Sequence, residues 1–305
     1  MQYNNRLLVD SVHLEFDRLQ VLQSAYITAQ TGRVTGVLGR NGCGKSCLFK
    51  CIMGGIKPQN IFIRLNDEPE TDYGHIGERV KYLPQNTFIP PKMTLGEAFD
   101  IYGVDYDGLV GFDPKFHTMQ RRQVRELSGG EVRIAEMYMI LNSKAEFCIL
   151  DEPFSNVAPK HVEKMQELIQ QHKASKGIII SDHMYESVMG ITDDLFLLRD
   201  GYTFPIKSRE DLIHHGYILR IRIYLRDSAW ENCRAFIVNS ESELRCCKDF
   251  EEMSPKEQKN IFVDKRGTKL KPQKRQNTDI LIVIATTYLL HRQVTHQETS
   301  STKIQ

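Results

Sequence analysis

The sequence predicts an α/β protein whose central sheet is mostly parallel. Three short apolar runs, at residues 34–38, 147–150 and 177–181, have the length and composition of buried strands. Stretches with helical character, such as residues 48–53 and 161–172, alternate with them, and this alternation is typical of βαβ units. In a parallel sheet the ligand binds at the carboxyl ends of the strands. The segments that directly follow these three strands are therefore the first candidates for a functional site.

The strand at residues 34–38 leads into a glycine-rich segment, GVLGRNGCGKSCLF, that matches the phosphate-binding pattern G-x-x-x-x-G-K-[ST]. Its glycines can adopt backbone angles that let successive N–H groups point at phosphate oxygens, and the following helix adds its positive end. We expect Lys45 to contact the β- and γ-phosphates and the Ser46 hydroxyl to bind Mg²⁺. The predicted nucleotide-binding residues of this loop are Gly39, Asn41, Gly42, Cys43, Gly44, Lys45, Ser46 and Cys47.

Two adjacent carboxylates, Asp151 and Glu152, end the apolar strand in the segment FCILDEP. Carboxylates beside a buried strand are unfavourable unless a cation or water lies next to them. Asp151 suits a magnesium shell, and Glu152 can orient or deprotonate an attacking water. The segment alone also fits an ordinary acidic turn, but the phosphate-binding loop favours the catalytic interpretation.

A third segment, RELSGGEVRIAEM, places Ser128, Gly129 and Gly130 directly before a stretch that favours helix. This pattern predicts a helix N-terminus with exposed N–H groups. One nucleotide does not need two such loops from the same chain. We therefore expect a second copy of the protein to use this one.

Composition narrows the class of protein without naming a partner. The chain has 305 residues, 41% of them hydrophobic, enough for one large domain or two ordinary ones. Its formal net charge of +1 gives no overall attraction to nucleic acid, and we expect no direct contact with nucleic acid. There is no secretory signal pattern, and no apolar run reaches the roughly 18 residues that span a bilayer. The sequence thus predicts a cytoplasmic chain.

Three of the seven cysteines, Cys43, Cys47 and Cys51, share one helical face. A soft-metal site would use such a face, but two of the three lie in or beside the phosphate-binding loop. Small side chains there also let the helix pack closely, and we favour that structural interpretation.

Taken in order, the motifs closely resemble those of the nucleotide-binding subunit of ATP-binding cassette (ABC) proteins, from about residue 7 to residue 201. GRNGCGKS resembles the Walker A motif, YLPQN the Q-loop, LSGGE the signature, CILDEP the Walker B motif and SDH the switch histidine. The resemblance implies a P-loop NTPase (RecA-like) core, an N-terminal antiparallel β subdomain and a helical signature subdomain at about residues 87–140. It also implies ATP and Mg²⁺ as cofactors.

The resemblance assigns roles that the residue types alone do not. Glu152 would act as general base, His183 would hold the γ-phosphate, and Gln85 would complete the shell of the metal or the water. Together with Ser46 and Asp151, Gln85 would form the metal site. Phe16, in LEFDRLQVLQ, would stack on adenine, although a lone phenylalanine also fits the core.

Two positions depart from the family pattern. Cys47 replaces the threonine that usually follows the P-loop serine, a mild change because Ser46 keeps the hydroxyl. Ala158 stands where the family usually carries an aspartate that crosses to the partner subunit. We expect this second change to weaken one dimer contact.

In this family two subunits enclose two ATP molecules, and the signature loop of each closes over the γ-phosphate held by the other. The resemblance implies a second copy or a homologous ABC subunit as one partner and a transmembrane permease as another. The chain would then lie on the cytoplasmic face of the membrane. The alternative is a soluble switch that acts on a nucleic-acid or ribosomal machine. Proteins of that kind usually carry two cassettes or a long coiled-coil insertion, and this sequence shows neither. A cassette without hydrolysis would lack Glu152 or His183.

The cassette is predicted to cover residues 1–218. Residues 219–305 match nothing familiar; YILRIRIYL has the alternation of a strand, and residues 279–290 suit a buried element, which suggests a small α+β extension. The basic segment DKRGTKLKPQKR fits a solvated loop better than a binding patch. The polar end, HQETSSTKIQ, has the composition of a disordered tail.

Overall fold

The computed structural model describes residues 5–155, 157–182, 185–218, 221–226 and 233–238. The chain separates into two compact units, Met1–Lys207 and Ser208–Gln305, and each is described by itself. The sequence-based boundary after residue 218 stays a prediction. Among the described residues, no helix is both long enough and apolar enough to cross a membrane.

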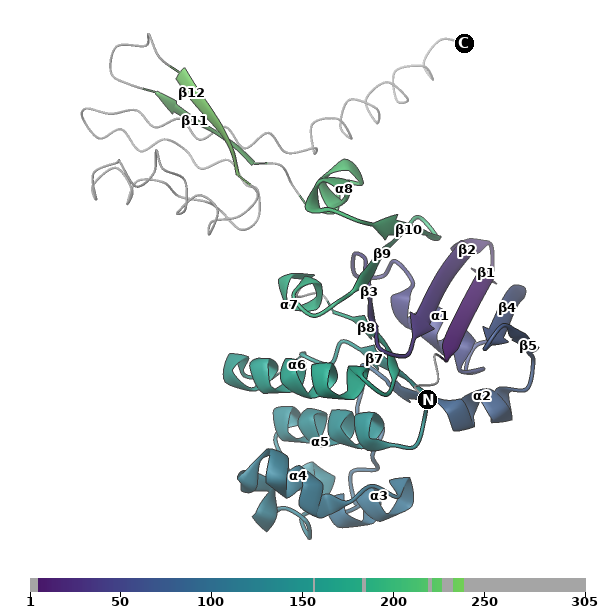
Figure 1. The fold of residues 1–305 in the computed structure, drawn as a ribbon, viewed down its shortest axis with the longest axis vertical. Helices are drawn as coiled ribbons and strands as arrows, with labels where there is room; N and C mark the ends of the chain where they lie inside the picture. Colours follow the sequence, from purple (N-terminus) through teal and green to yellow (C-terminus); the bar gives the residue numbers. More distant parts are fainter. Residues whose placement is uncertain (1–4, 156, 183–184, 219–220, 227–232, 239–305) are drawn as a thin grey trace, which may run out of the picture. The chain divides into compact units, whose positions relative to one another are not determined.

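One continuous sheet organises the first unit (Figure 1). Its strands are β1 (Arg6–Phe16), β2 (Leu19–Gln30), β3 (Val34–Leu38), β4 (Asn60–Leu65), β5 (Glu68–Glu70), β6 (Val80–Leu83), β7 (Phe147–Asp151), β8 (Gly177–Ser181), β9 (Asp194–Arg199) and β10 (Tyr202–Ile206). They lie in the order β5-β4-β1-β2-β10-β9-β3-β8-β7-β6. Strands β5, β4, β1 and β2 pair antiparallel, whereas β9, β3, β8, β7 and β6 pair parallel. The predicted parallel core and antiparallel β subdomain are both present.

Burial follows from this division. Every residue of β3, β7 and β8 is buried, as expected for parallel strands covered on both faces. Strand β1 alternates between buried and partly exposed residues over most of its length, because only one of its faces meets the core. The three strands that were predicted from their apolar runs are thus the most deeply buried in the sheet.

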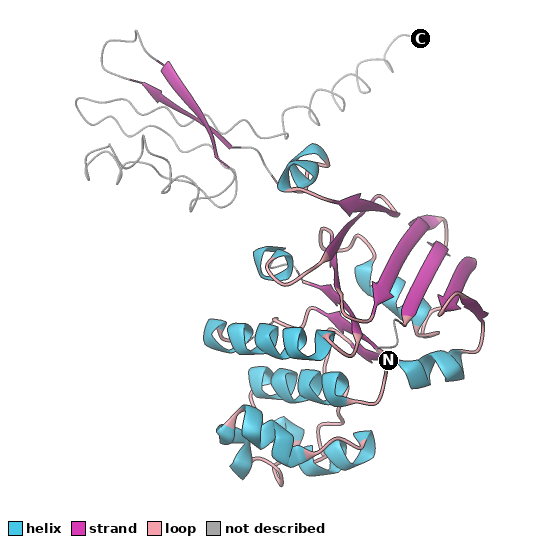
Figure 2. Ribbon diagram, in the orientation of Figure 1, coloured by secondary structure: helices cyan, strands magenta, loops and turns pink. Residues whose placement is uncertain are grey.

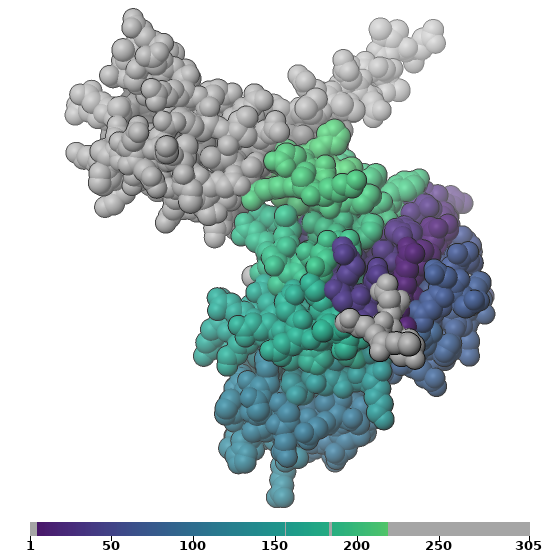
Figure 3. Space-filling view, viewed as in Figure 1, coloured from purple at the N-terminus to yellow at the C-terminus, as the bar shows by residue number. Residues whose placement is uncertain are grey.

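Helices surround the parallel strands and form one end of the unit (Figure 2). They are α1 (Lys45–Ile52), α2 (Tyr73–Arg79), α3 (Leu95–Tyr102), α4 (Tyr106–Phe112), α5 (Gly129–Asn142), α6 (Pro159–Lys173) and α7 (Tyr185–Met189), with 3-10 turns η1 (Pro114–Thr118) and η2 (Val124–Glu126). Helices α3 and α4 and both turns fall within the predicted helical subdomain, as does most of α5. In the space-filling view their blue residues lie beside the teal residues of α5 and α6 (Figure 3).

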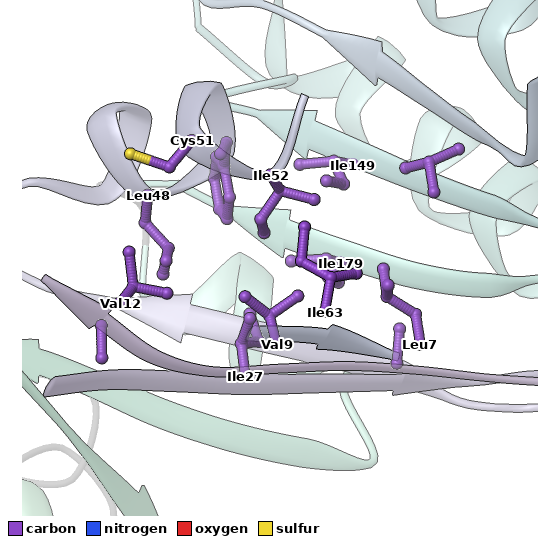
Figure 4. Close-up of a cluster of buried hydrophobic side chains, with 14 of the residues drawn as sticks. Leu7, Val9, Val12, Ile27, Leu48, Cys51, Ile52, Ile63, Ile149 and Ile179 are labelled. Carbon is purple, nitrogen blue, oxygen red and sulfur yellow. The ribbon is translucent and has the colours of Figure 1, made fainter. Parts of the chain in front are cut away.

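Helix α1 packs between the two parts of the sheet (Figure 4). Leu48 and Ile52 on α1 are fully buried, against Val9 and Ile27 from the antiparallel strands and Ile149 from β7. Full burial of a leucine or isoleucine side chain contributes about 1.5–3 kcal/mol relative to an exposed one. The helix that follows the phosphate-binding loop is therefore firmly held by the core.

The described part of the second unit contains α8 (Arg209–His214) and the antiparallel strands β11 (Ile221–Arg226) and β12 (Cys233–Val238). A capping box formed by Ser208 and Asp211 begins α8. The strand expected in YILRIRIYL overlaps β11. The buried element, basic loop and polar tail predicted further on lie outside the described residues.

Candidate functional site

The loop between β3 and α1 has the backbone shape that its glycines permit. Gly42 and Gly44 have φ angles of 81° and 106°, which side-chain-bearing residues rarely adopt. At Gly39, an added Cβ would lie 2.4 Å from the Cys43 Sγ atom and 2.8 Å from the backbone oxygen of Leu198. The pattern of glycines is thus required by the loop's conformation and packing.

Lys45 begins α1 and folds back over this loop. Its side chain is buried, with a residue exposure of 5%, and Nζ donates to the Gly39 carbonyl at 2.8 Å. No side chain caps α1, because its N-cap is Gly44, so the first-turn N–H groups are left without that partner. Ser46 and Cys47 are half-buried and Asn41 is exposed. A buried cation at a helix start whose N-cap residue has no side chain suits a phosphate group.

Asp151 ends β7 with its carboxylate fully buried. One oxygen accepts from the Tyr82 hydroxyl at 3.0 Å and the other from the Ser181 hydroxyl at 2.7 Å. Burial, reinforced by the Asp151 charge, raises the pKa of Tyr82, so this phenol stays a donor. A carboxylate has about four acceptor positions, and each oxygen therefore keeps one for a further ligand.

Glu152 and Gln85, predicted to act together, lie in contact. The Gln85 Nε2 atom donates to Glu152 Oε2 at 2.8 Å, and the Ser155 hydroxyl donates to the same oxygen at 3.2 Å. Glu152 has a φ of 50°, and a non-glycine residue in this region costs of order 1–3 kcal/mol. Its N–H donates to the Ser181 carbonyl at 2.7 Å. The neighbouring strand thus helps to hold an unfavourable backbone conformation.

Two charged residues that the sequence analysis missed lie behind this pair. Arg133 and Glu136 on α5 have exposures of 5% and 0%, and their side chains approach to 3.7 Å. Burial lowers the pKa of Arg133 and raises that of Glu136. Charges three positions apart within the apolar run VRIAEMYMIL are the signal that could have identified them, since such residues rarely enter a core unless paired.

The signature segment begins α5 and faces outward. Ser128 is the N-cap, its hydroxyl accepting from the Glu131 N–H at 3.3 Å, and the Ser128 N–H donates to the Glu131 carboxylate at 2.9 Å. Ser128 and Gly129 are exposed, and Gly130 is partly so. A Cβ added at Gly129 would have no neighbour within 4 Å. The predicted helix N-terminus is present and accessible.

Phe16 lies at the end of β1 with 45% of its surface exposed. The hairpin turn that follows contains Asp17 and Arg18, with φ angles of 45° and 86°. The ring does not pack in the core, which removes the structural alternative raised by the sequence. Its stacking on adenine stays a prediction.

His183 lies outside the described residues, so its predicted role is not addressed by the structure. The residue before it, Asp182, follows β8 and is fully buried. Its carboxylate accepts from the Phe154 N–H at 3.1 Å. This bond joins the segment after β8 to the segment after β7.

The cysteine face of α1 packs as small apolar side chains do. Cys51 is buried in the core, and burial raises its pKa to about 12; burial also raises the pKa of Cys43 and Cys47. Thiols with raised pKa values are poor metal ligands. In the part of the chain that the structure describes, no cluster of three or more His, Cys, Asp or Glu could hold a metal ion.

Ala158 is the N-cap of α6, followed by Pro159 at the first helical position. The Ala158 carbonyl accepts from the N–H groups of His161 and Val162, but the alanine side chain has no acceptor, and no side-chain cap is present there. The substitution that departs from the family pattern therefore also leaves a helix end uncapped.

Comparison with known proteins agrees with this geometry. Residues 22–155 match the family model described as ABC transporter. The chain is 27% identical over 238 residues to the lipopolysaccharide export system ATP-binding protein LptB of Acidithiobacillus ferridurans, covering 72% of this chain and 97% of that protein. It is 24% identical to the probable sulfate/thiosulfate import ATP-binding protein CysA of Chlorella vulgaris, covering 68% and 94%.

Solved structures give the same fold. An ATP-binding subunit of an ABC transporter aligns with a TM-score of 0.60 at 21% identity, over 69% of this chain and 93% of that one. A nucleotide-free ATP-binding cassette from an ABC transporter aligns with a TM-score of 0.59 at 20% identity, over 69% and 94%.

A phosphate-binding loop and two strand-end carboxylates on a parallel sheet are typical of P-loop NTPases. Within that class, the chain is similar to ABC transporter ATP-binding proteins, whose family model matches residues 22–155. It is an ATP-binding ATPase.

Proposed function

We propose that this chain is the ATP-hydrolysing subunit of an ABC transporter and drives a separate membrane-embedded permease. The names of its relatives include an export and an import system, and both describe an ATP-binding protein. The proposal therefore concerns the ATP-driven step rather than a particular cargo. It places the chain on the cytoplasmic face of the membrane and requires no contact with nucleic acid.

The observation that carries the proposal is the contact between Gln85 and Glu152, at the same edge of the sheet as the P-loop. Strands β3, β8, β7 and β6 are neighbours, so their carboxyl ends bring Lys45, Asp151 and the Gln85–Glu152 pair to one edge. Phosphoryl transfer to water depends mainly on positioning and charge neutralisation. These are the tasks that a buried lysine and a held carboxylate can perform.

In this proposal Lys45 and the amides of the P-loop bind the β- and γ-phosphates. Glu152 accepts a proton from the attacking water, and the Gln85 amide holds the carboxylate that does so. Phe16 stacks on adenine, and His183 contacts the γ-phosphate. The catalytic residues are thus Lys45, Gln85, Glu152 and His183.

The residues proposed for Mg²⁺ fit that ion. Ser46, Gln85 and Asp151 offer a hydroxyl, an amide oxygen and a carboxylate, and Mg²⁺ prefers oxygen ligands. The fully buried Asp151 carboxylate, which accepts from two neutral hydroxyls, is a suitable counter-charge. When bound, Mg²⁺ would neutralise charge on the phosphates.

The proposal includes a dimer, of two copies or of this chain with a homologous ABC subunit. The exposed Ser128–Gly130 segment of one subunit would close over the nucleotide held by the other. ATP would favour the closed dimer and ADP the open one, and this population shift would be passed to the permease. Ala158 removes one side chain from the expected interface.

Hydrolysis by Glu152→Gln tests the proposal. We expect turnover to fall by about 100-fold or more, the usual contribution of a general base, while the protein still binds ATP and forms a dimer in its presence. Glu146→Gln is the matched control, because Glu146 precedes the same strand and pairs with Arg79. Turnover in Glu152→Gln equal to that of the wild type would refute the role of Glu152.

A further inference from the structure

Arg133 connects three backbone carbonyls of the catalytic edge. Its Nη1 atom donates to the Pro84 carbonyl at 2.6 Å, and Nη2 donates to the carbonyls of Asp151 and Glu152, the latter at 3.0 Å. Pro84 directly precedes Gln85 in the chain. One guanidinium thus holds the segment after β6 and the segment after β7 at a fixed separation, where Gln85 and Glu152 form their hydrogen bond.

Glu136 holds the same segment from its other side. Its Oε1 atom accepts from the N–H groups of Phe88 at 2.9 Å and Ile89 at 3.4 Å. Because Arg133 bonds Pro84 and Glu136 bonds Phe88, the two side chains bracket residues 85–87. Their charges lie 3.7 Å apart and offset one another in a buried environment.

Glu152 is held on both sides of its strained backbone. Its N–H is bonded to the Ser181 carbonyl and its own carbonyl to Arg133. Apolar side chains could have packed α5 on the sheet without fixing either carbonyl. Two of the three bonds from Arg133 instead go to Asp151 and Glu152, whose carboxylates are proposed to bind Mg²⁺ and to act as general base.

We propose that Arg133 and Glu136 are positioning residues that keep Gln85 and Glu152 in contact. Both lie on α5, whose first residues form the signature segment, so a movement of this helix also moves the Gln85–Glu152 pair. When the partner's nucleotide binds at the signature segment, a shift of α5 would thereby change the position of Glu152 in the same subunit as that segment. This inference rests on the proposed function, because it assigns the pair to ATP hydrolysis.

The test measures ATP turnover, KM for ATP, ATP affinity and thermal unfolding in the full chain. We expect Arg133→Lys to lower kcat about tenfold or more, because an ammonium is a point charge and cannot replace a planar fork bonded to three carbonyls. KM and Kd for ATP should stay within about threefold, since P-loop binding is unchanged. Arg79→Lys is the matched control. Arg79 pairs with Glu146 at the amino ends of β6 and β7, away from the catalytic edge, so the kcat of this variant should match the wild type.

A double-mutant cycle separates positioning from general stability. If Arg133 acts through the Gln85–Glu152 contact, Arg133→Lys should cost less than about half as much, in log kcat, in a Gln85→Ala background as in the wild type, because coupled residues are non-additive. Full additivity in folded proteins would overturn the proposal. So would a folded Arg133→Lys variant with wild-type kcat.

Glu136→Gln provides an independent decision. It keeps an oxygen for Phe88 and Ile89 but removes one of the negative charges that face Arg133, and we expect kcat to fall by about threefold or more at unchanged KM. If Arg133→Lys does not fold, Glu136→Gln decides, and an unchanged kcat in Glu136→Gln overturns the proposal. If neither variant folds, the proposal is replaced by a purely structural role for the two residues. A wild type no more active than Glu152→Gln would instead refute the proposed function.

Discussion

Helices α1 and α5 both start at glycines, Gly44 before α1 and Gly129 at the first position of α5, but their N-termini are capped differently. Helix α1 has Gly44 as its N-cap, with no side-chain acceptor, and buried Lys45 at its start. Helix α5 has Ser128 as its N-cap and a full capping box with Glu131. The first lies beside the strand-end carboxylates, whereas Ser128 and Gly129 are exposed.

This difference indicates two ways of using a helix end. The amides of α1 have no capping side chain, and a phosphate would supply their missing acceptor. The α5 terminus is already stabilised within its own chain, so it can present exposed groups to a second subunit without losing its fold. Changes at α1 should therefore affect binding and hydrolysis, and changes at the α5 terminus hydrolysis alone.

The largest expected effect is that of Lys45→Met. Removing a buried cation from the phosphate site should lower hydrolysis by roughly 1,000-fold, at the upper end for loss of one charge-stabilising group, and weaken ATP binding as well. Lys50→Met, an exposed lysine on the same helix, is the control and should hydrolyse ATP like the wild type. Titration with a fluorescent ATP analogue and a phosphate-release assay measure the two quantities.

Gly129→Glu should have the next largest effect and should separate binding from hydrolysis. The site is open, so the added side chain is accommodated, but its charge would repel a phosphate brought by another subunit. We expect hydrolysis to fall by about 100-fold with unchanged ATP affinity. Gly111→Glu, also at an open glycine, should leave hydrolysis unchanged. Weakened ATP binding by Gly129→Glu would contradict the separation of roles.

The smallest effect concerns the uncapped start of α6. Ala158→Asp should raise the free energy of unfolding by about 0.5–1 kcal/mol, because it gives the helix an N-cap acceptor. Ala158→Asn supplies a similar cap without the charge and should stabilise to a similar extent. Urea unfolding measures both. If hydrolysis increases only in the aspartate variant, the lost cross-subunit group matters in addition to the cap.

Local patterns predicted much of the fold and part of the site. The three buried strands were predicted from short apolar runs. The glycines of the P-loop predicted the unusual backbone angles that the structure shows there. The contact of Gln85 with Glu152 was consistent with the expected strand topology. Each of these features depends on a segment of the chain or on one rule of sheet connectivity.

The sequence did not predict the groups that hold those residues in place. Arg133, Tyr82 and Ser181 act on Asp151 or Glu152 from three different elements, and their roles depend on how α5, β6 and β8 pack. Hydrogen bonds between residues 18 to 69 positions apart leave no local pattern. The exposure of Phe16 could not be predicted from the sequence either, because it depends on the geometry of the hairpin between β1 and β2.

Mixing two inactive variants tests most directly whether one nucleotide uses α1 of one subunit and the α5 terminus of another. Lys45→Met and Gly129→Glu proteins are purified, mixed in equal amounts and assayed with ATP, beside each variant alone. In half of the dimers, both changes should fall in one composite site and leave the other intact. We expect about a quarter of wild-type activity if the two sites act independently. A mixture as inactive as its components, with mixed dimers demonstrated by cross-linking, would contradict the account.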